Sequence, residues 1–311
     1  MLQQTPTLTT ESKLVRCGSR DEWKTKRMLG LTGTDAGIIA GVTRKYGSRY
    51  ELYLKKTGQL VDVEEEVYTH PEDRYGPRYW GIEQEPILLK TFRDDKGLSV
   101  HTDPEWSIRR HPTLKWMLAT PDGHVYDPKL GWGVLEIKTA GLFKESEWKY
   151  GRVPKSYLLQ VFHYMIVMNY QYAWFAALIG GQKYRTFFIP RDDSFCEMLV
   201  AAEQRFWARI QNREPPEIDG HPATTQAVAA MHPEWEDEVT ELETESLSWD
   251  MQRAKAIEDQ EESTTRRAEA ENKIKDAIGE AAYGILPNSA GRYSWKGKPR
   301  RLLRLKSKEE G

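Results

Sequence analysis

The sequence predicts an α/β chain of the α+β type, with a central mixed β-sheet flanked by helices. Two pairs of apolar segments with strand-like character are each joined by a short turn, and segments with helical spacing lie before, between and after them. The composition then changes at the double proline 215–216. We therefore expect a core over residues 1–216 and a helical arm with a basic tail over residues 217–311.

Length and charge set broad limits. A chain of 311 residues can bury a substantial core without disulfides, and its two cysteines, Cys17 and Cys196, are far apart in sequence. No signal-peptide stretch and no run long enough to span a bilayer is present. We expect a soluble, cytoplasmic protein. The formal net charge of −2 argues neither for nor against a nucleic-acid partner, so any DNA contact must come from local patches.

The N-terminal part is polar and Thr-rich, and we expect it to stay loose until a helix begins near Asp21. A turn-rich segment then leads into a small-residue helix, for which Thr34 or Asp35 is the natural N-cap. A helix N-terminus of this kind can bind a phosphate. Another helix is expected from Tyr50 to Thr57, followed by a loop to about Tyr75.

The next elements surround the chemically informative residues. Apolar spacing between Trp80 and Phe92 predicts a helix, and Pro86 must lie in its first turn or kink it, which puts Glu85 near a helix start. The segments from Leu118 to Tyr126 and from Trp132 to Lys138 read as two strands joined by a turn. They predict a hairpin at the centre of the first half.

The second half of the core begins with an almost wholly apolar helix from Pro154 to Met168, which we expect to be buried against that sheet. A second hairpin pairs residues 172–179 with residues 183–189 across two glycines. A long amphipathic helix from about Asp193 to Asn212 then leads to the double proline.

The C-terminal part differs in composition. Residues 235–282 are rich in Glu, Lys and Ala and predict a helical arm or hairpin with a weak apolar stripe. The tail from Arg292 to Lys308 concentrates basic residues around Tyr293 and Trp295. Such a tail can follow a DNA backbone while its aromatic rings stack on unpaired bases. A disordered, solubilising tail is the alternative interpretation.

The candidate site is Asp122, separated by thirteen residues from Glu136. Side chains alternate along a strand, so Glu136 and Lys138 share one face while Leu135 and Ile137 point into the opposite, apolar layer. If the two strands pair, Asp122 lies within reach of Glu136. Two carboxylates and an interposed backbone carbonyl form an all-oxygen site that suits Mg²⁺ or Mn²⁺. A neighbouring lysine adds the positive charge that metal-assisted phosphodiester hydrolysis requires.

Two further residues can complete this site. Glu85 can supply an oxygen ligand directly or through water, and Gln160 can orient the water or Lys138. Ordinary explanations exist for the single signals, because an Asp-Gly pair is usually a turn and a Glu-x-Lys pair on one strand face is usually a salt bridge. Only the combination of residues in this order favours catalysis.

Six segments between about residues 27 and 190 form an ordered set: Leu31–Ala36, Tyr50–Tyr53, Gly81–Pro86, Ala119–Gly123, Leu135–Thr139 and Tyr157–Met165. In this order the chain resembles the YqaJ-like viral recombinase and lambda exonuclease family, within the PD-(D/E)xK nuclease superfamily. The resemblance implies a restriction-endonuclease-like core in which Asp122, Glu136 and the carbonyl of Ile137 bind Mg²⁺, with Mn²⁺ as a substitute. Residues 217–311 lie outside it.

The resemblance also implies roles for the other residues. Glu85 would assist a second metal or a water, and Lys138 and Gln160 would form the catalytic polar pair. The arginine and the hydroxyl residue that hold the 5′ phosphate in the family correspond here to Arg27, by spacing, and to Thr34, where the family usually has Ser.

The helix that reads Gln-Val-Gln-His in the family reads Gln160-Val161-Phe162-His163 here, so the second glutamine is not kept. We interpret His163 as a packed core histidine rather than as a metal ligand.

The implied activity is a magnesium-dependent, processive exonuclease on linear double-stranded DNA. It would work from 5′ to 3′ and leave 3′ single-stranded overhangs for an annealing recombinase in phage-type recombination. The implied assembly is a homo-oligomer, for which a ring-shaped trimer is one form. The implied location is the cytoplasm of a bacterial host if the gene belongs to a phage. The alternatives are another PD-(D/E)xK endonuclease or repair nuclease, and a catalytically silent scaffold that binds DNA ends.

Overall fold

The computed structural model describes residues 7–43, 47–60 and 75–305, so the loop expected before Tyr75 falls mostly outside the described residues. The chain forms two compact units that divide between Trp235 and Glu236. We expected the boundary after residue 216. The difference arises because helix α7 (Pro222–Met231) packs against helix α3 (Arg49–Lys56) and buries Ala227 there.

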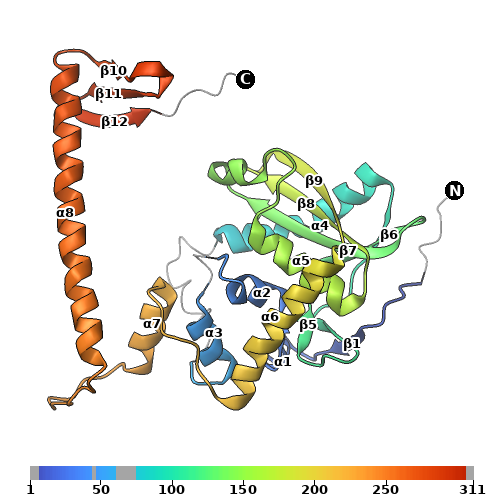
Figure 1. The fold of residues 1–311 in the computed structure, drawn as a ribbon. Coiled ribbons are helices and arrows are strands. Elements are labelled where there is room, and N and C mark those ends of the chain that lie inside the picture. Colours follow the sequence, from blue (N-terminus) through green and yellow to red (C-terminus); the bar gives the residue numbers. More distant parts are fainter. Residues whose placement is uncertain (1–6, 44–46, 61–74, 306–311) are drawn as a thin grey trace. The chain divides into compact units, whose positions relative to one another are not determined.

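A mixed five-stranded sheet lies at the centre of the first unit, in the order β3–β6–β7–β8–β9 (Figure 1). Neighbouring strands are antiparallel except β7 and β8, which are parallel and therefore need a crossover connection. That crossover contains helix α5. The predicted mixed sheet and second hairpin are confirmed. The strands are β3 (Ser99–His101), β6 (Gly123–Asp127), β7 (Gly131–Ala140), β8 (Tyr172–Ile179) and β9 (Lys183–Pro190).

Helices cover both faces of this sheet. Helix α4 (Pro77–Lys96) packs its apolar residues against Leu135 and Ile137 of β7. Helix α5 (Lys155–Met168) covers the opposite face, and helix α6 (Asp193–Asn212) packs on α5. The predicted alternation along β7 is therefore confirmed, because its apolar side chains face α4. A 3₁₀ segment, η3 (Leu142–Trp148), follows β7.

A smaller sheet, in the order β1–β4–β5–β2, contains β1 (Lys13–Arg16), which pairs with β4 in the stretch that we expected to be loose. The strand predicted from Leu118 to Tyr126 is also wrong as a single element. Its first part belongs to this smaller sheet and its second part to the larger one. The break includes Pro121, which has no N–H to donate to a strand ladder. The remaining strands are β2 (Leu31–Thr32), β4 (Ser107–Arg110) and β5 (Met117–Ala119).

Helix α4 begins earlier than expected. Pro77 occupies the first helical position, where the missing N–H removes no internal hydrogen bond. Pro86 consequently lies inside the helix and not in its first turn. The prediction that Glu85 lies near a helix start is therefore wrong, and this residue is in the middle of α4.

The N-terminal helices follow the sequence closely. Helix α1 (Arg20–Met28) begins one residue before the expected start, and helix α2 (Gly33–Ile39) has Thr32 as its N-cap instead of Thr34 or Asp35. The cap lies earlier because the Asp35 carboxylate accepts a hydrogen bond of 2.8 Å from the backbone N–H of Thr32.

The second unit confirms the predicted helical arm as α8 (Ser246–Ile278). It also contains an antiparallel three-stranded sheet where we expected only a basic tail, and Lys306 and Lys308 lie outside the described residues. None of the described helices of either unit is long and apolar enough to cross a membrane. The other elements are β10 (Tyr283–Ile285), the 3₁₀ turn η4 (Pro287–Ser289), β11 (Arg292–Lys296) and β12 (Arg301–Leu305).

Candidate active site

The buried carboxylate of Glu136 lies at the centre of the site. Glu136 is only 1% exposed and extends from β7 toward α5. Its Oε1 atom accepts a hydrogen bond of 2.5 Å from Lys138 Nζ, on the same strand face, and one of 2.6 Å from Gln160 Nε2. Its Oε2 atom is buried and has no hydrogen-bond partner among the described residues. One oxygen is thus held by two donors, while the other has none.

Asp122 reaches β7 from the break between the two sheets. Its Oδ2 atom accepts a hydrogen bond of 2.7 Å from the backbone N–H of Ile137, the residue between Glu136 and Lys138. This bond fixes the carboxylate beside the strand that carries the other two functional side chains. The expected proximity of Asp122 to β7 is found, although Asp122 stands at a strand break and not within a hairpin strand.

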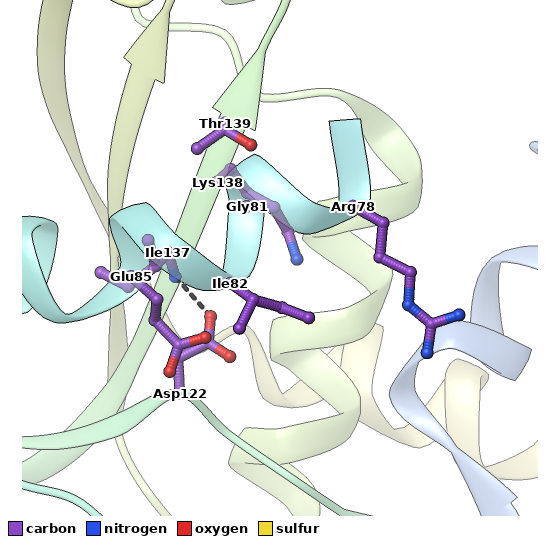
Figure 2. A pocket seen from close by; sticks show the side chains of 8 residues that line it. All are labelled: Arg78, Gly81, Ile82, Glu85, Asp122, Ile137, Lys138 and Thr139. Carbon is purple, nitrogen blue, oxygen red and sulfur yellow. Dashed lines mark hydrogen bonds between the residues drawn. The ribbon is translucent and has the colours of Figure 1, made fainter. Parts of the chain in front are cut away.

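A cavity of about 240 Å³ opens beside these residues. Asp122, Ile137 and Lys138 line it from one side, and Glu85 lines it from α4. Figure 2 shows the carboxylates of Glu85 and Asp122 turned toward each other. The cavity therefore gathers oxygen donors from the strand break, from β7 and from α4, next to one lysine.

The electrostatics reflect this crowding. Burial, and then the nearby Asp122 carboxylate, raise the pKa of Glu85 to about 7. Burial and Asp122 also raise the pKa of Glu136 to about 8, although Lys138 acts in the opposite direction. Burial raises the pKa of Asp122 despite the opposing effects of Lys138 and the Ile137 N–H. For Lys138, burial lowers the pKa, but the two carboxylates outweigh it and raise the pKa overall.

These residues fit a hard divalent cation. A buried carboxylate oxygen without a partner is costly unless a cation or donor binds it, and an excess of carboxylates over cations disfavours their ionised forms. Glu136 Oε2 and the raised pKa values of Glu85 and Glu136 are the features that a bound cation would relieve. Within residues 7–43, 47–60 and 75–305, no three His, Cys, Asp or Glu side chains converge as a complete metal site.

Gln160 was expected to orient the water or Lys138, but its side chain is hydrogen-bonded to Glu136. Its Nε2 atom donates to Glu136 Oε1 and lies 3.2 Å from the hydroxyl of Tyr164, one turn further along α5. Burial and then Glu136 raise the pKa of Tyr164 to about 12, so this hydroxyl keeps its proton. The start of α2 comes close to both side chains, because a Cβ on Gly33 would lie 2.6 Å from a ring carbon of Tyr164.

The two residues expected to hold a 5′ phosphate come from α1 and α2, which approach Tyr164 in the middle of α5. Arg27 is in the last turn of α1, with its guanidinium carbon 4.3 Å from the ring centroid of Trp23. Its Nε atom is buried and has no hydrogen-bond partner in the described part of the chain. Its charge acts on both Asp35 and Tyr164. Thr34, in the first turn of α2, is exposed, and its hydroxyl oxygen lies 3.0 Å from that of Thr32.

Three residues with a place at the site escaped the sequence prediction. Arg78 lines the cavity from α4, and its spacing from Gly81, Ile82 and Glu85 is that of one helix face, a signal that a correct helix start would have shown. Tyr164 lies in a recognised motif but had no assigned role. Lys56 forms a buried ion pair of 2.9 Å with Asp35, and no local pattern indicates it.

His163 is fully buried, and its Nδ1 atom lies 2.9 Å from Glu203 Oε1, while Nε2 lies 2.9 Å from the carbonyl oxygen of Leu118. With a carboxylate and a carbonyl as partners, both ring nitrogens act as donors, so the ring ties α5 to α6 and β5. The interpretation of His163 as a packed core histidine agrees with these contacts.

Comparisons with a family model and with a curated protein both find similarity to YqaJ. Residues 22–171 match the model of the YqaJ-like viral recombinase domain family. The uncharacterized protein YqaJ of Bacillus subtilis (strain 168) is 33% identical over 274 residues, which cover 87% of this chain and 82% of that protein.

Two solved structures are similar at lower levels. An alkaline exonuclease from Laribacter hongkongensis is 19% identical, with a TM-score of 0.49, covering 62% of this chain and 94% of that chain. A phage related exonuclease from Haemophilus somnus 129PT is 16% identical, with a TM-score of 0.35, covering 60% of this chain and 96% of that chain.

Proposed function

This chain belongs to the YqaJ-like viral recombinase family, and from that premise we propose that it is a divalent-metal-dependent nuclease that acts on DNA. The observation that carries the proposal is the state of Glu136. Its carboxylate is buried beside Asp122, with one oxygen held by Lys138 and Gln160 and the other without a described partner. A purely structural salt bridge does not need a second crowded carboxylate.

Asp122, Glu136 and the carbonyl of Ile137 would hold Mg²⁺, or Mn²⁺ in its place, and Glu85 would act from α4 directly or through a water. When bound, the cation supplies a polarised phosphate and a water of lowered pKa. The ligand set is hard and composed of oxygen atoms, which suits these ions.

The chain's own residues provide the rest of the chemistry. Gln160 and Lys138 fix the Glu136 carboxylate from two directions, so little reorganisation is needed when substrate binds. Lys138 also keeps its positive charge at neutral pH, because the surrounding carboxylates raise its pKa. That charge can stabilise the negative charge that develops on the scissile phosphate.

The proposal includes digestion from the 5′ end. An arginine whose buried Nε has no described partner and a nearby exposed hydroxyl suit a terminal phosphate, and Arg27 and Thr34 are such a pair. The remaining features follow the expectations from the sequence. They are processive digestion of linear duplex DNA, 3′ overhangs passed to an annealing recombinase, a ring-shaped homotrimer around DNA, and action in the cytoplasm of a bacterial host.

A single digestion experiment tests this proposal. Linear duplex DNA labelled at either the 5′ or the 3′ end and a closed circular duplex are each incubated with Mg²⁺ or EDTA. We expect Mg²⁺-dependent release of the 5′ label, with the circle left intact. Cleavage of the circle would favour an endonuclease. Binding of linear DNA without any cleavage would favour a scaffold that binds DNA ends.

A further inference from the structure

The three-stranded sheet of the second unit carries a concentrated positive charge. Residues 281–305 contain six Lys or Arg residues and no Asp or Glu, although the formal net charge of the whole chain is −2. Helix α8 differs, because most of its cations pair with acidic residues one turn away, as Lys255 does with Glu258 and Arg267 with Glu271. The sheet is thus the basic part of this unit.

One face of the sheet packs against α8. A Cβ on Gly284 would lie 2.6 Å from a side-chain carbon of Ile278, and Lys275 Nζ lies 5.7 Å from the ring centroid of Trp295. Arg300 fixes the end of the helix, since its guanidinium donates to the carbonyls of Gly279, Glu280 and Ala281. This arginine is therefore structural.

The other face is exposed. Side chains alternate along a strand, so the cross-strand register groups one set of residues on this face. Tyr283, Ile285 and Leu303 are 49%, 82% and 59% exposed. We call the exposed residues of this set the basic sheet face; they are Tyr283, Ile285, Arg292, Lys296, Arg301 and Leu303, and the buried Ser294 and half-buried Leu305 lie among them.

The basic side chains on the basic sheet face are exposed and can contact a ligand. Arg292 and Arg301 are exposed and have no hydrogen bond or ion pair with any residue between 7 and 305 that the structure describes. Lys296 Nζ lies 3.9 Å from the ring centroid of Tyr283 and bonds its hydroxyl. An aromatic ring with a cation on it, on the same sheet face as two guanidinium groups, combines a stacking surface with charges for phosphates.

We propose that the basic sheet face binds single-stranded DNA. Single strands offer phosphates together with unpaired base faces, whereas a duplex hides the base faces in its stack. Exposed Tyr283, Ile285 and Leu303 gain contacts only with the unpaired form. The inference rests on the proposed function in one respect: a nuclease that leaves single-stranded overhangs produces this ligand.

The test uses fluorescence anisotropy to measure how the full-length protein binds a labelled oligo-dT of about thirty nucleotides. The measurement is made in EDTA over a range of salt concentrations. In the variant that combines Arg292→Glu and Arg301→Glu, we expect affinity to fall about tenfold or more. Replacing two phosphate contacts should reduce the slope of log K against log salt by about 1.4. Tyr283→Ala should weaken binding about tenfold, whereas Tyr283→Phe keeps the ring and should bind like the wild type.

The matched control combines Arg253→Glu and Arg266→Glu on α8, which makes the same change in net charge within the same unit. Circular dichroism and melting check that every variant is folded. Equal affinities for the sheet variant and the control would overturn the proposal. A loss seen only with a duplex oligonucleotide would also overturn it, in favour of duplex binding.

Digestion in Mg²⁺ is recorded separately. If the wild type digests DNA but the sheet variants bind oligo-dT normally, this inference fails while the proposed function stands. If no DNA is digested but the sheet variants lose oligo-dT binding, the proposed function fails while the binding face stands.

Discussion

Lys56 offers a sharp test of how the structure supports the proposed phosphate-binding residues. Its side chain is 3% exposed, and Nζ lies 2.9 Å from Asp35 Oδ2. The same ammonium donates to the carbonyls of Gly30, at 2.7 Å, and Arg27, at 3.1 Å. One buried cation therefore joins α3 to the end of α1 and to the capping carboxylate of α2.

Replacing Lys56 with Met removes all three contacts while keeping much of the side-chain volume. Among the described residues, Asp35 would keep its hydrogen bonds with Thr32 alone. Removing one partner of a buried ion pair typically costs about 3–5 kcal/mol, because an uncompensated charge remains. We therefore expect Lys56→Met to lower the free energy of unfolding of the first unit by about 3–5 kcal/mol.

The pH dependence has a defined sign. Burial alone would raise the pKa of Asp35, but Lys56, the Thr32 N–H and Arg27 together lower it. A lowered folded-state pKa contributes stability above the unfolded carboxyl pKa of about 4, and this contribution is lost as the pH falls through the folded value. The stability difference between the wild type and Lys56→Met should narrow in acid.

The assay is urea unfolding followed by tryptophan fluorescence at neutral pH. Lys55→Met is the matched control, because Lys55 pairs with Glu51 at 3.0 Å on the same helix with side chains 23% and 20% exposed. A pair of this kind contributes about 0.5 kcal/mol. Lys56→Met should also raise the KM for ends with a 5′ phosphate. Equal destabilisation by the two substitutions would refute the reasoning.

Three further predictions concern the core around the site. Gln160→Leu removes a donor to the proposed catalytic carboxylate of Glu136 and should lower kcat about 100-fold with little change in KM, measured by steady-state digestion. Gly33→Ala places a Cβ 2.6 Å from Tyr164, so thermal melting should show a loss of about 1–3 kcal/mol, and activity should fall as well. Burial lowers the pKa of His163, but the Glu203 carboxylate outweighs burial and raises the pKa overall. The pair therefore stabilises the folded protein at pH values below the ordinary histidine pKa. That stability should be lost as pH rises through the folded pKa, and Glu203→Gln should flatten this dependence in melting curves from pH 6 to pH 9.

Local periodicity predicted how the side chains of β7 are arranged. The alternation along β7 separated Glu136 and Lys138 from the apolar residues that face α4, because strand side chains point to opposite faces in turn. The proximity of Asp122 to that strand was also expected. Its position at a break between two sheets was not, because apolar residues on both sides of Pro121 read as one continuous strand.

Long-range contacts and short strands were harder to predict. Lys56 reaches the α2 cap across 21 positions of sequence, a contact that only the packed fold creates. In the second unit, the segment Arg292–Lys296 alternates polar and aromatic residues and forms β11. Its basic residues favoured a tail, whereas this period-two pattern favours a strand. Neighbouring β10 has three residues, one of them Gly284, so it carries almost no strand signal.

The measurement that tests the central claim most directly is the rate of hydrolysis of linear duplex DNA by the wild type and Glu136→Gln. This substitution keeps the shape of the side chain and removes the charge that would hold the cation. We predict Mg²⁺-dependent hydrolysis by the wild type and a loss on the order of 10³-fold in Glu136→Gln, with DNA binding in EDTA retained. Glu83→Gln, at an exposed position of α4, is the control and should be as active as the wild type. Equal hydrolysis by Glu136→Gln and Glu83→Gln would contradict the account.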